Sequence, residues 1–243
     1  MTALAGVATL VFILAGTAVG IRLLWLARRT RGLPELYIGL GLVLICGVAY
    51  PVGLSSQIET VPDGSRSVLM FVSMSALAVG SGYIVAFVRN VFRPDEAWAR
   101  LLAGFLYASF IGLAVMLPFL LMRGPMDPIG GYFVARQALM VAVFGWSAIE
   151  SALYWRKLLR RAAVGLADPE VVNRVGLWCV SGVASVLSSV TTLSVGISGL
   201  NPFQHPVALL VVALSGLVSS SSLVLAFLPP ERYRAWVRSR PTA

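Results

Sequence analysis

The stretch Pro169 to Ala184, PEVVNRVGLWCVSGVA, repeats a stretch near the start of the chain, Pro34 to Ala49, which reads PELYIGLGLVLICGVA. Aligned at an offset of 135 residues, the two agree at seven of sixteen positions. The identical pairs are Pro34/Pro169, Glu35/Glu170, Gly41/Gly176, Leu42/Leu177, Gly47/Gly182, Val48/Val183 and Ala49/Ala184. Because a repeat at a fixed offset constrains the architecture of the whole chain, this match predicts two copies of one structural unit.

Weaker agreement flanks this match on both sides. Upstream, with a two-residue gap that makes the offset 133, the agreeing pairs are Leu26/Leu159, Arg28/Arg161, Gly32/Gly165 and Leu33/Leu166. Downstream, at an offset of 140, they are Ser75/Ser215, Leu77/Leu217, Ser81/Ser221, Ala86/Ala226 and Phe87/Phe227. These matches place one copy at about residues 3–93 and the other at about 131–228. The segment at about 97–122 has no counterpart and is expected to link the two copies.

Composition indicates what each copy is made of. The 243 residues are 58% apolar and 12% charged, and the mean hydropathy is +0.86, which does not fit an ordinary soluble domain. A spanning helix needs about 20 mostly apolar residues, and such windows run over 3–27, 34–56, 67–88, 98–122, 131–155, 174–198 and 205–228. The sequence therefore predicts an all-α polytopic membrane protein, with residues 1–243 forming one domain of seven transmembrane helices.

Basic residues are distributed unevenly between the two ends of such a bundle. With the N-terminus outside, the outer half receives only Arg66, Arg123 and Arg136 of the 19 lysines and arginines. The tryptophans near the inner basic clusters are Trp25, Trp98, Trp155, Trp178 and Trp236. The positive-inside rule thus predicts an N-out, C-in, multi-pass protein of the inner (cytoplasmic) membrane. The net charge of +9 then reflects topology and attraction to anionic lipid, not nucleic acid binding.

Prolines mark particular points in the predicted helices. Pro34 and Pro169, each followed by a glutamate, suit the first turn of a helix, where an acid also faces the positive end of the helix dipole. Pro51, directly after Tyr50, falls inside the second window and predicts a kink there. The basic tail 229–243 carries aromatic residues among its arginines and is expected to lie at the membrane interface.

Three helices, one linking helix and three more helices put both copies in the same orientation, as in parallel repeats about an axis along the membrane normal. This 3+1+3 plan resembles the sugar carriers called SWEETs and, more broadly, seven-helix proteins of the transporter–opsin–receptor type. The resemblance covers the whole chain and is architectural, because the carriers' Pro-Gln pair and the NPxxY and DRY patterns of G-protein-coupled receptors are absent. Opsins attach retinal to a lysine of helix seven; the only lysine here, Lys157, lies in a predicted inner loop, so no retinal is expected.

Residues that carry catalysis or bind metals are sparse. Metal sites need clusters of His, Cys or carboxylate, but the chain has a single histidine, His205. Its two cysteines, Cys46 and Cys179, fall inside predicted helices, where a free cysteine behaves as a small apolar residue. The GxSxG, HExxH and P-loop motifs are missing as well. We therefore expect no enzymatic activity, no cofactor and no metal ion.

A polar stripe in the fifth window carries the candidate site. At 100° per residue, five polar side chains fall within about 60° of one another, namely Tyr132, Arg136, Ser147, Glu150 and Tyr154. Trp146 flanks the stripe. Charged groups at membrane depth are costly in lipid and mark function by default. The stripe is therefore expected to face the interior of the bundle.

Two roles are predicted from this stripe. The ligand-binding residues are expected to be Arg136, Trp146, Tyr50, Tyr132 and Ser185. Ser185 joins this set because the repeat pairs it with Tyr50 at the offset of 135. Glu150 is expected to form an intramembrane ion pair with Arg22, or alternatively with Arg89.

Each feature also has a simpler structural interpretation. Arg136 lies near the outer end of its window, where an arginine can also snorkel to the interface or pair with Asp127. Trp146 can equally be a packing residue. The serine stripes of the sixth and seventh windows, Ser181, Ser185, Ser188 and Thr192, and Ser215, Ser219 and Ser222, either line a cavity or form close helix contacts.

The leading expectation is a receptor-like sensor. It would bind a small solute in a central, outward-facing cavity lined by Arg136, Trp146 and Tyr50, and signal to a cytoplasmic partner through its inner loops. The alternative is a facilitative small-solute carrier whose two three-helix units rock about the same site. A third reading is a structural or assembly subunit. The expected partners are the lipid bilayer, a small-molecule ligand and a signalling protein.

Overall fold

A computed structural model describes residues 2–58, 60–122, 130–202 and 204–239. These residues form helices joined by short turns, with no strand among them. The helices are α1 (Thr2–Thr30), α2 (Leu33–Leu42), η1 (Val43–Ala49), α3 (Tyr50–Ser55), α4 (Asp63–Phe92), α5 (Ala97–Leu121), α6 (Gly131–Ala162), α7 (Pro169–Ile197), α8 (Pro206–Phe227) and α9 (Glu231–Ser239). The all-α prediction is confirmed.

Seven spans in the described ranges are long and apolar enough to cross a membrane, and α2, η1 and α3 together make the second of them. They coincide with the seven predicted windows. Between 17% and 39% of each apolar window is buried within the protein, so most of their apolar surface faces outward. Lipid accepts such a surface, and helices satisfy their own backbone hydrogen bonds there. The chain is therefore a multi-pass membrane protein.

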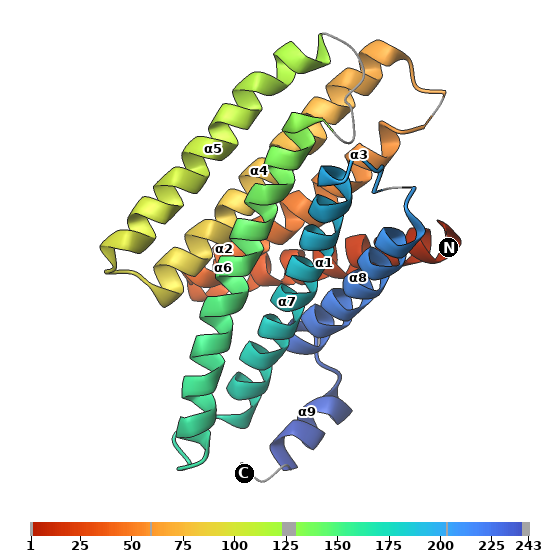
Figure 1. Ribbon diagram of the computed structural model, residues 1–243. Coiled ribbons are helices and arrows are strands. Elements are labelled where there is room, and N and C mark those ends of the chain that lie inside the picture. Colours follow the sequence, from red (N-terminus) through yellow and green to blue (C-terminus); the bar gives the residue numbers. More distant parts are fainter. Residues whose placement is uncertain (1, 59, 123–129, 203, 240–243) are drawn as a thin grey trace.

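The spans form a ring with one helix outside it (Figure 1). Around the ring, α1 packs on α2, α2 on α4, α4 on α6, α6 on α7, α7 on α8, and α8 returns to α1. The remaining span, α5, has its main contacts with α4 and α6 and lies at the edge of the bundle. The end of the bundle where α4, α6 and α8 finish, and beyond which α9 lies, is called the basic end below.

The proline predicted to kink the second span is associated with a wider type of helix. The π-helical segment η1 ends at Ala49, directly before Tyr50 and Pro51. Pro51 has no N–H, and its ring crowds the carbonyl one turn back, so widening of the preceding turn relieves the clash. The hydroxyl of Ser73 on α4 donates to the carbonyl oxygen of Ala49 at 2.8 Å. This bond ties the distorted segment to its neighbour.

Local helix-start signals hold in both of the matched stretches, 34–49 and 169–184. Pro34 lies in the first turn of α2, and Pro169 begins α7. Ahead of Pro169, the side chain of Asp168 accepts a hydrogen bond from the backbone N–H of Glu170 at 2.8 Å. This N-cap satisfies one of the free donors at the helix start. The predicted role of the two Pro-Glu pairs as helix starts is confirmed.

Serines on α7 and α8 make direct helix contacts. The hydroxyls of Ser181 and Ser219 lie 2.8 Å apart and form a buried hydrogen bond between the two helices. The hydroxyl of Thr192 donates to the carbonyl of Ser188 one turn back. Small hydroxylated residues allow close approach in membrane bundles and hydrogen-bond across helices. For Ser181 and Ser219, the packing alternative describes the structure.

The basic tail forms a helix that docks beside the start of α7. The hydroxyl of Tyr233 on α9 donates to the side-chain oxygen of Asn173 at 3.0 Å, and Arg238 pairs with Glu170. Val237 is buried on the same side of α9. Described residues 231–239 of the predicted interfacial tail therefore form an amphipathic helix with one face on the bundle.

Candidate functional site

Arg136 lies on α6 without a carboxylate partner among the described residues. Its Nη1 group donates to the sulfur of Met74 on α4 at 3.6 Å, and a thioether is a weak acceptor. Its Cζ atom also lies 5.0 Å from the ring centre of Phe133. Asp127, the acid considered as its partner from sequence, lies outside the described residues. A partly buried guanidinium is thus left with donors that a ligand can use.

The Arg136 pocket, as it is called below, opens between three helices. It is lined by Met74, Ser75, Leu77 and Ala78 of α4, by Phe110, Leu113, Ala114 and Leu117 of α5, and by Tyr132, Arg136 and Met140 of α6. The space between these walls, open mouth included, is about 300 Å³. Its enclosed part is narrow, with room for about one water molecule. The pocket lies between α5 and the ring, whereas the sequence predicted a cavity at the centre.

One of the two tyrosines predicted for the site accompanies Arg136. Tyr132 lies one turn before Arg136 on α6 and lines the same pocket. Tyr50 begins α3 and is not among the residues that line the pocket. Its ring packs edge-on against Phe12 of α1, with ring centres 5.3 Å apart. Of the predicted ligand residues, the pocket therefore brings together Arg136 and Tyr132.

Trp146 does not line the Arg136 pocket. It lies ten residues further along α6, about 15 Å at 1.5 Å per residue, and is 7% exposed. Its ring packs against Trp98 at the start of α5, with ring centres 6.0 Å apart. Among the described residues its buried indole N–H has no hydrogen-bond partner. The prediction that Trp146 forms the wall of a cavity around Arg136 does not match this placement, because α5 brings Trp98 against it instead.

Ser185 is also outside the Arg136 pocket. It lies on α7, and its hydroxyl donates to the carbonyl oxygen of Ser181 one turn back at 2.9 Å. The α7 helix packs on α6 and α8, whereas the pocket is formed by α4, α5 and α6. The prediction that Ser185 binds the same ligand as Arg136, which relied on the repeat, therefore does not match the structure, because α7 does not line the pocket.

The predicted ion pair of Glu150 exists, but its partner is different. The Nε group of Arg93 donates to both carboxylate oxygens of Glu150, at 3.0 and 2.9 Å. Arg22, the predicted partner, lies on α1, which packs on α2 and α8, while α4 packs directly on α6. Arg93 follows the last residue of α4 and so reaches Glu150. The hydrogen bond and charge of Glu150 raise the pKa of Arg93 above its ordinary value, and the guanidinium stays charged.

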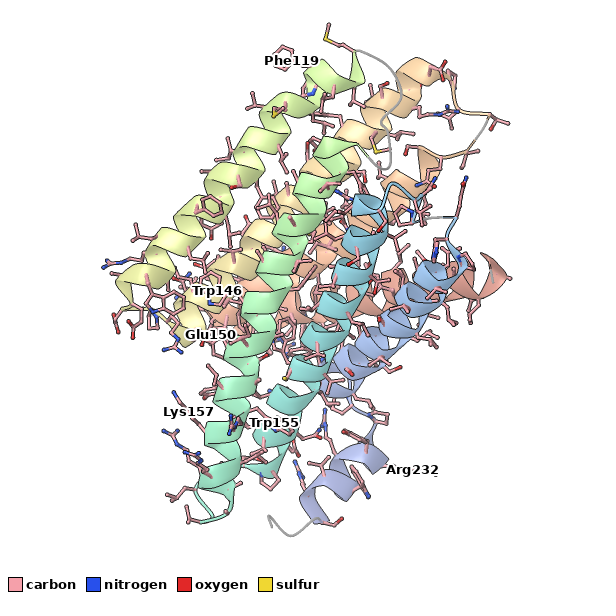
Figure 2. All side chains as sticks on the ribbon, viewed as in Figure 1. Phe119, Trp146, Glu150, Trp155, Lys157 and Arg232 are labelled. Atoms are coloured by element: carbon pink, nitrogen blue, oxygen red, sulfur yellow. The ribbon has the colours of Figure 1, made fainter. Side chains whose placement is uncertain are left out.

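Aromatic rings extend this ion pair into a cluster, named here the Arg93 junction: Arg93, Trp98, Trp146 and Glu150. The Cζ atom of Arg93 lies 5.7 Å from the ring centre of Trp98, which in turn packs against Trp146. Figure 2 shows Trp146 and Glu150 on the same side of α6, toward the turn between α4 and α5. The junction joins three helices near the basic end.

Other reactive side chains have structural roles. His205 caps α8, its Nδ1 atom accepting from the backbone N–H of Ala208 at 3.4 Å. Cys46 and Cys179 are free and buried. Within the described residues, no group of three His, Cys, Asp or Glu side chains is placed to hold a metal ion.

The site combines a positive charge, a phenolic hydroxyl and apolar walls, which together suit binding of an anionic group. The sequence indicated the charge and the tyrosine through their spacing on one helix face. It missed the wall formed by α5, because Phe110 and Ala114 look like ordinary residues of an apolar helix. It also missed Arg93, whose position just after α4 was the available signal.

Comparison of the chain with family models, with curated proteins and with solved structures found no match.

Proposed function

We propose that the protein is a receptor-like membrane sensor that binds a small anionic ligand at Arg136. One observation carries this proposal: a guanidinium inside a helix-lined pocket, without a carboxylate partner among the described residues. An ionised group among apolar side chains is costly unless it is paired. An anion is the natural partner of a guanidinium.

The α6 helix offers a route from the ligand to the inner side. It runs without a break over 32 residues from Gly131 to Ala162. Arg136 lies near one end, and Glu150 of the Arg93 junction lies more than halfway along. A ligand that shifts α6 at Arg136 would therefore also move Glu150 relative to Arg93 in the Arg93 junction, where α4 and α5 meet. The cytoplasmic partner would read this change at the loops of the basic end.

The proposed orientation is N-out and C-in, in the cytoplasmic membrane. The helix ends at the basic end carry most of the arginines, including Arg28, Arg29, Arg160 and Arg161 in the last turns of α1 and α6. Because arginine-rich ends are retained on the cytoplasmic side, α9 would lie inside. The Arg136 pocket would lie in the outer half of the membrane.

The proposed architecture is a pair of parallel repeats, with α1, the second span and α4 equivalent to α6, α7 and α8. The two-fold axis of such a repeat would exchange the α4–α6 interface with the α8–α1 interface, and the helices of each pair are in contact. This relation supports the repeat.

One matched glycine pair supports the repeat, and another shows where the copies differ. A Cβ atom on Gly47 would lie 3.3 Å from Thr17 of α1, and one on Gly182 would lie 3.3 Å from Ala148 of α6. Each glycine thus faces the first helix of its copy. Gly41, by contrast, faces α4, while its match Gly176 faces α6. The π-helical η1 begins at Val43, after Gly41, and contains Gly47; it changes the rotation of the second span, and α7 has no such segment.

Binding to the purified protein tests the proposed function. Calorimetric titration with a panel of carboxylates should identify anions that bind the natural protein, and Arg136→Gln should lose that binding by about tenfold or more. Arg136→Lys keeps the charge without the planar fork and should retain part of it. Arg156→Gln, at an exposed position of the same helix, is the matched control and should bind normally. Equal binding by Arg136→Gln contradicts the proposal.

A facilitative carrier is the second candidate. It is favoured by the arrangement of the ring, in which two sets of three helices meet at the α4–α6 and α8–α1 interfaces. Rocking of one set against the other would move these interfaces. Flux of a bound anion into proteoliposomes, lost in Arg136→Gln, would select the carrier; binding without flux selects the sensor. If neither binding nor flux is found, both are contradicted and a structural subunit remains.

A further inference from the structure

We propose that the ligand of the Arg136 pocket is an amphiphilic anion, a single alkyl chain that ends in a carboxylate, and that it reaches the pocket from the lipid beside α5. This inference rests on the proposed function of the same site, and it adds the chemical class of the ligand and its route.

The position of the pocket supports a route through lipid. One wall is formed by α5, which lies outside the ring against α4 and α6. The opposite side of α5 exposes large apolar side chains, among them Phe105, Ile111 and Phe119, and Figure 2 shows Phe119 pointing away from the bundle. One helix therefore separates the pocket from the acyl chains around the protein.

The lining defines a ligand with one charged end and an apolar body. Arg136 supplies the charge, and the neighbouring Tyr132 supplies a hydroxyl. Most other lining side chains are apolar, including Leu77, Phe110 and Met140. Pockets use apolar walls for the body of a ligand and a few polar groups for its orientation. A small hydrophilic anion would leave these walls unused.

The charge favours a carboxylate over a phosphate monoester. The pocket holds a single guanidinium, and Tyr132, one turn before it on α6, lines the same pocket. A guanidinium binds a carboxylate with two parallel hydrogen bonds, and one positive charge balances one negative charge. A phosphate monoester carries close to two negative charges at neutral pH, so part of its charge would remain unbalanced in an apolar setting.

Depth in the bundle agrees with this orientation. Arg136 is five residues beyond Gly131, the first residue of α6, or about 8 Å along the helix. Met140 lies one turn deeper, and Phe110 is near the middle of α5. A carboxylate at Arg136 would thus lie near the membrane surface, and its alkyl chain would point toward the membrane centre, parallel to the lipid chains.

Room for the chain requires α5 to move. The enclosed part of the pocket takes about one water molecule, less than an alkyl chain needs. Among the seven described spans α5 is the least buried, with 17% of its apolar window inside the protein. It can therefore shift outward at the smallest loss of packing. Ligand binding should separate Ala114 from Arg136 and pull on Trp98 in the Arg93 junction.

The test compares three probes on the full chain in lipid nanodiscs: dodecanoate, dodecanol and acetate. Dodecanoate has both the alkyl chain and the carboxylate, dodecanol has the chain without the charge, and acetate has the carboxylate without the chain. In competition against a fluorescent dodecanoate, dodecanoate should bind at least about tenfold more tightly than dodecanol or acetate. In Arg136→Gln, dodecanoate should bind no more tightly than dodecanol. A nitroxide pair at Val115 and on α6 should report outward movement of α5 when dodecanoate is added.

Filling the pocket provides an independent arm. Ala114→Phe places a ring in the cavity and should block dodecanoate. Val115→Phe, one residue on and exposed to lipid, is the matched control and should bind normally; gel filtration checks that both variants fold.

The outcomes separate the inference from the proposed function. Acetate binding as tightly as dodecanoate, and dependent on Arg136, would retain an anion sensor and overturn the amphiphile. Dodecanoate binding that is unchanged in both Arg136→Gln and Ala114→Phe would show simple partition into lipid and overturn the inference. If no anion of any length depends on Arg136, the proposed function fails together with the inference.

Discussion

Arg93 donates to both carboxylate oxygens of Glu150, at 3.0 and 2.9 Å, and joins the end of α4 to α6. The two side chains are unequally buried: 6% of Glu150 is exposed and 29% of Arg93. Breaking a buried pair is costly because the partner left behind is desolvated and uncompensated. The pair should therefore respond differently to the loss of each member.

Arg93→Ala should destabilise the protein more than Glu150→Ala. The first variant leaves a carboxylate almost without access to solvent, at a cost of about 3 kcal/mol. The second leaves an arginine that is partly exposed and still lies beside Trp98. Thermal unfolding in detergent measures both. Arg22→Ala, the partner expected from sequence, serves as the control, and a loss at Arg22 equal to that at Arg93 would contradict this account of the junction.

Gly16→Ala should disrupt the contact between α1 and the second span. A Cβ atom built at Gly16 would lie 2.3 Å from the sulfur of Cys46, which is itself fully buried. Overpacking of this kind costs about 1–3 kcal/mol. Gly6→Ala on the same helix is the matched control, since nothing lies within 4 Å of its added carbon. Equal melting temperatures for the two variants would show that the helices are not this close.

Docking of α9 should depend more on Val237 than on Arg238. The Arg238–Glu170 pair is largely exposed on the arginine side, and exposed ion pairs contribute about 0–1 kcal/mol. Val237 is buried against the bundle, so Val237→Asp should release the helix. Limited trypsin digestion after the tail arginines reports the release. Ala235→Asp, at an exposed position of α9, should behave like the natural protein; early cleavage in that control would argue against a docked face.

The two ends of the chain should lie on opposite sides of the membrane. Seven spans separate them, and the arginine-rich ends favour the inner side for α9. A reporter enzyme active only inside the cell should work after residue 243 and fail before residue 1, and a reporter active only outside should show the reverse. Activity of the same reporter at both ends would remove the topology and the parallel repeat with it.

The features that can be read from the sequence are local ones. The seven spans follow from apolar runs longer than the membrane is thick, and lipid permits little besides helices there. The starts of α2 and α7 follow from Pro34 and Pro169, whose effect on the chain does not depend on distant residues. The spacing of Tyr132, Arg136 and Glu150 on one face of α6 was equally readable, because it is a property of one helix.

Which helix each of these faces meets depends on how the spans pack in three dimensions. The order of helices in the bundle results from side-chain packing between them, and one helix's periodicity contains no information about its neighbours. Glu150 meets Arg93 because α4 packs on α6. Trp146 packs against Trp98 because α5 begins beside it. Residues further along α5 form an apolar wall of the Arg136 pocket. The charges could be found by reading the chain, but their partners depended on how the spans pack together.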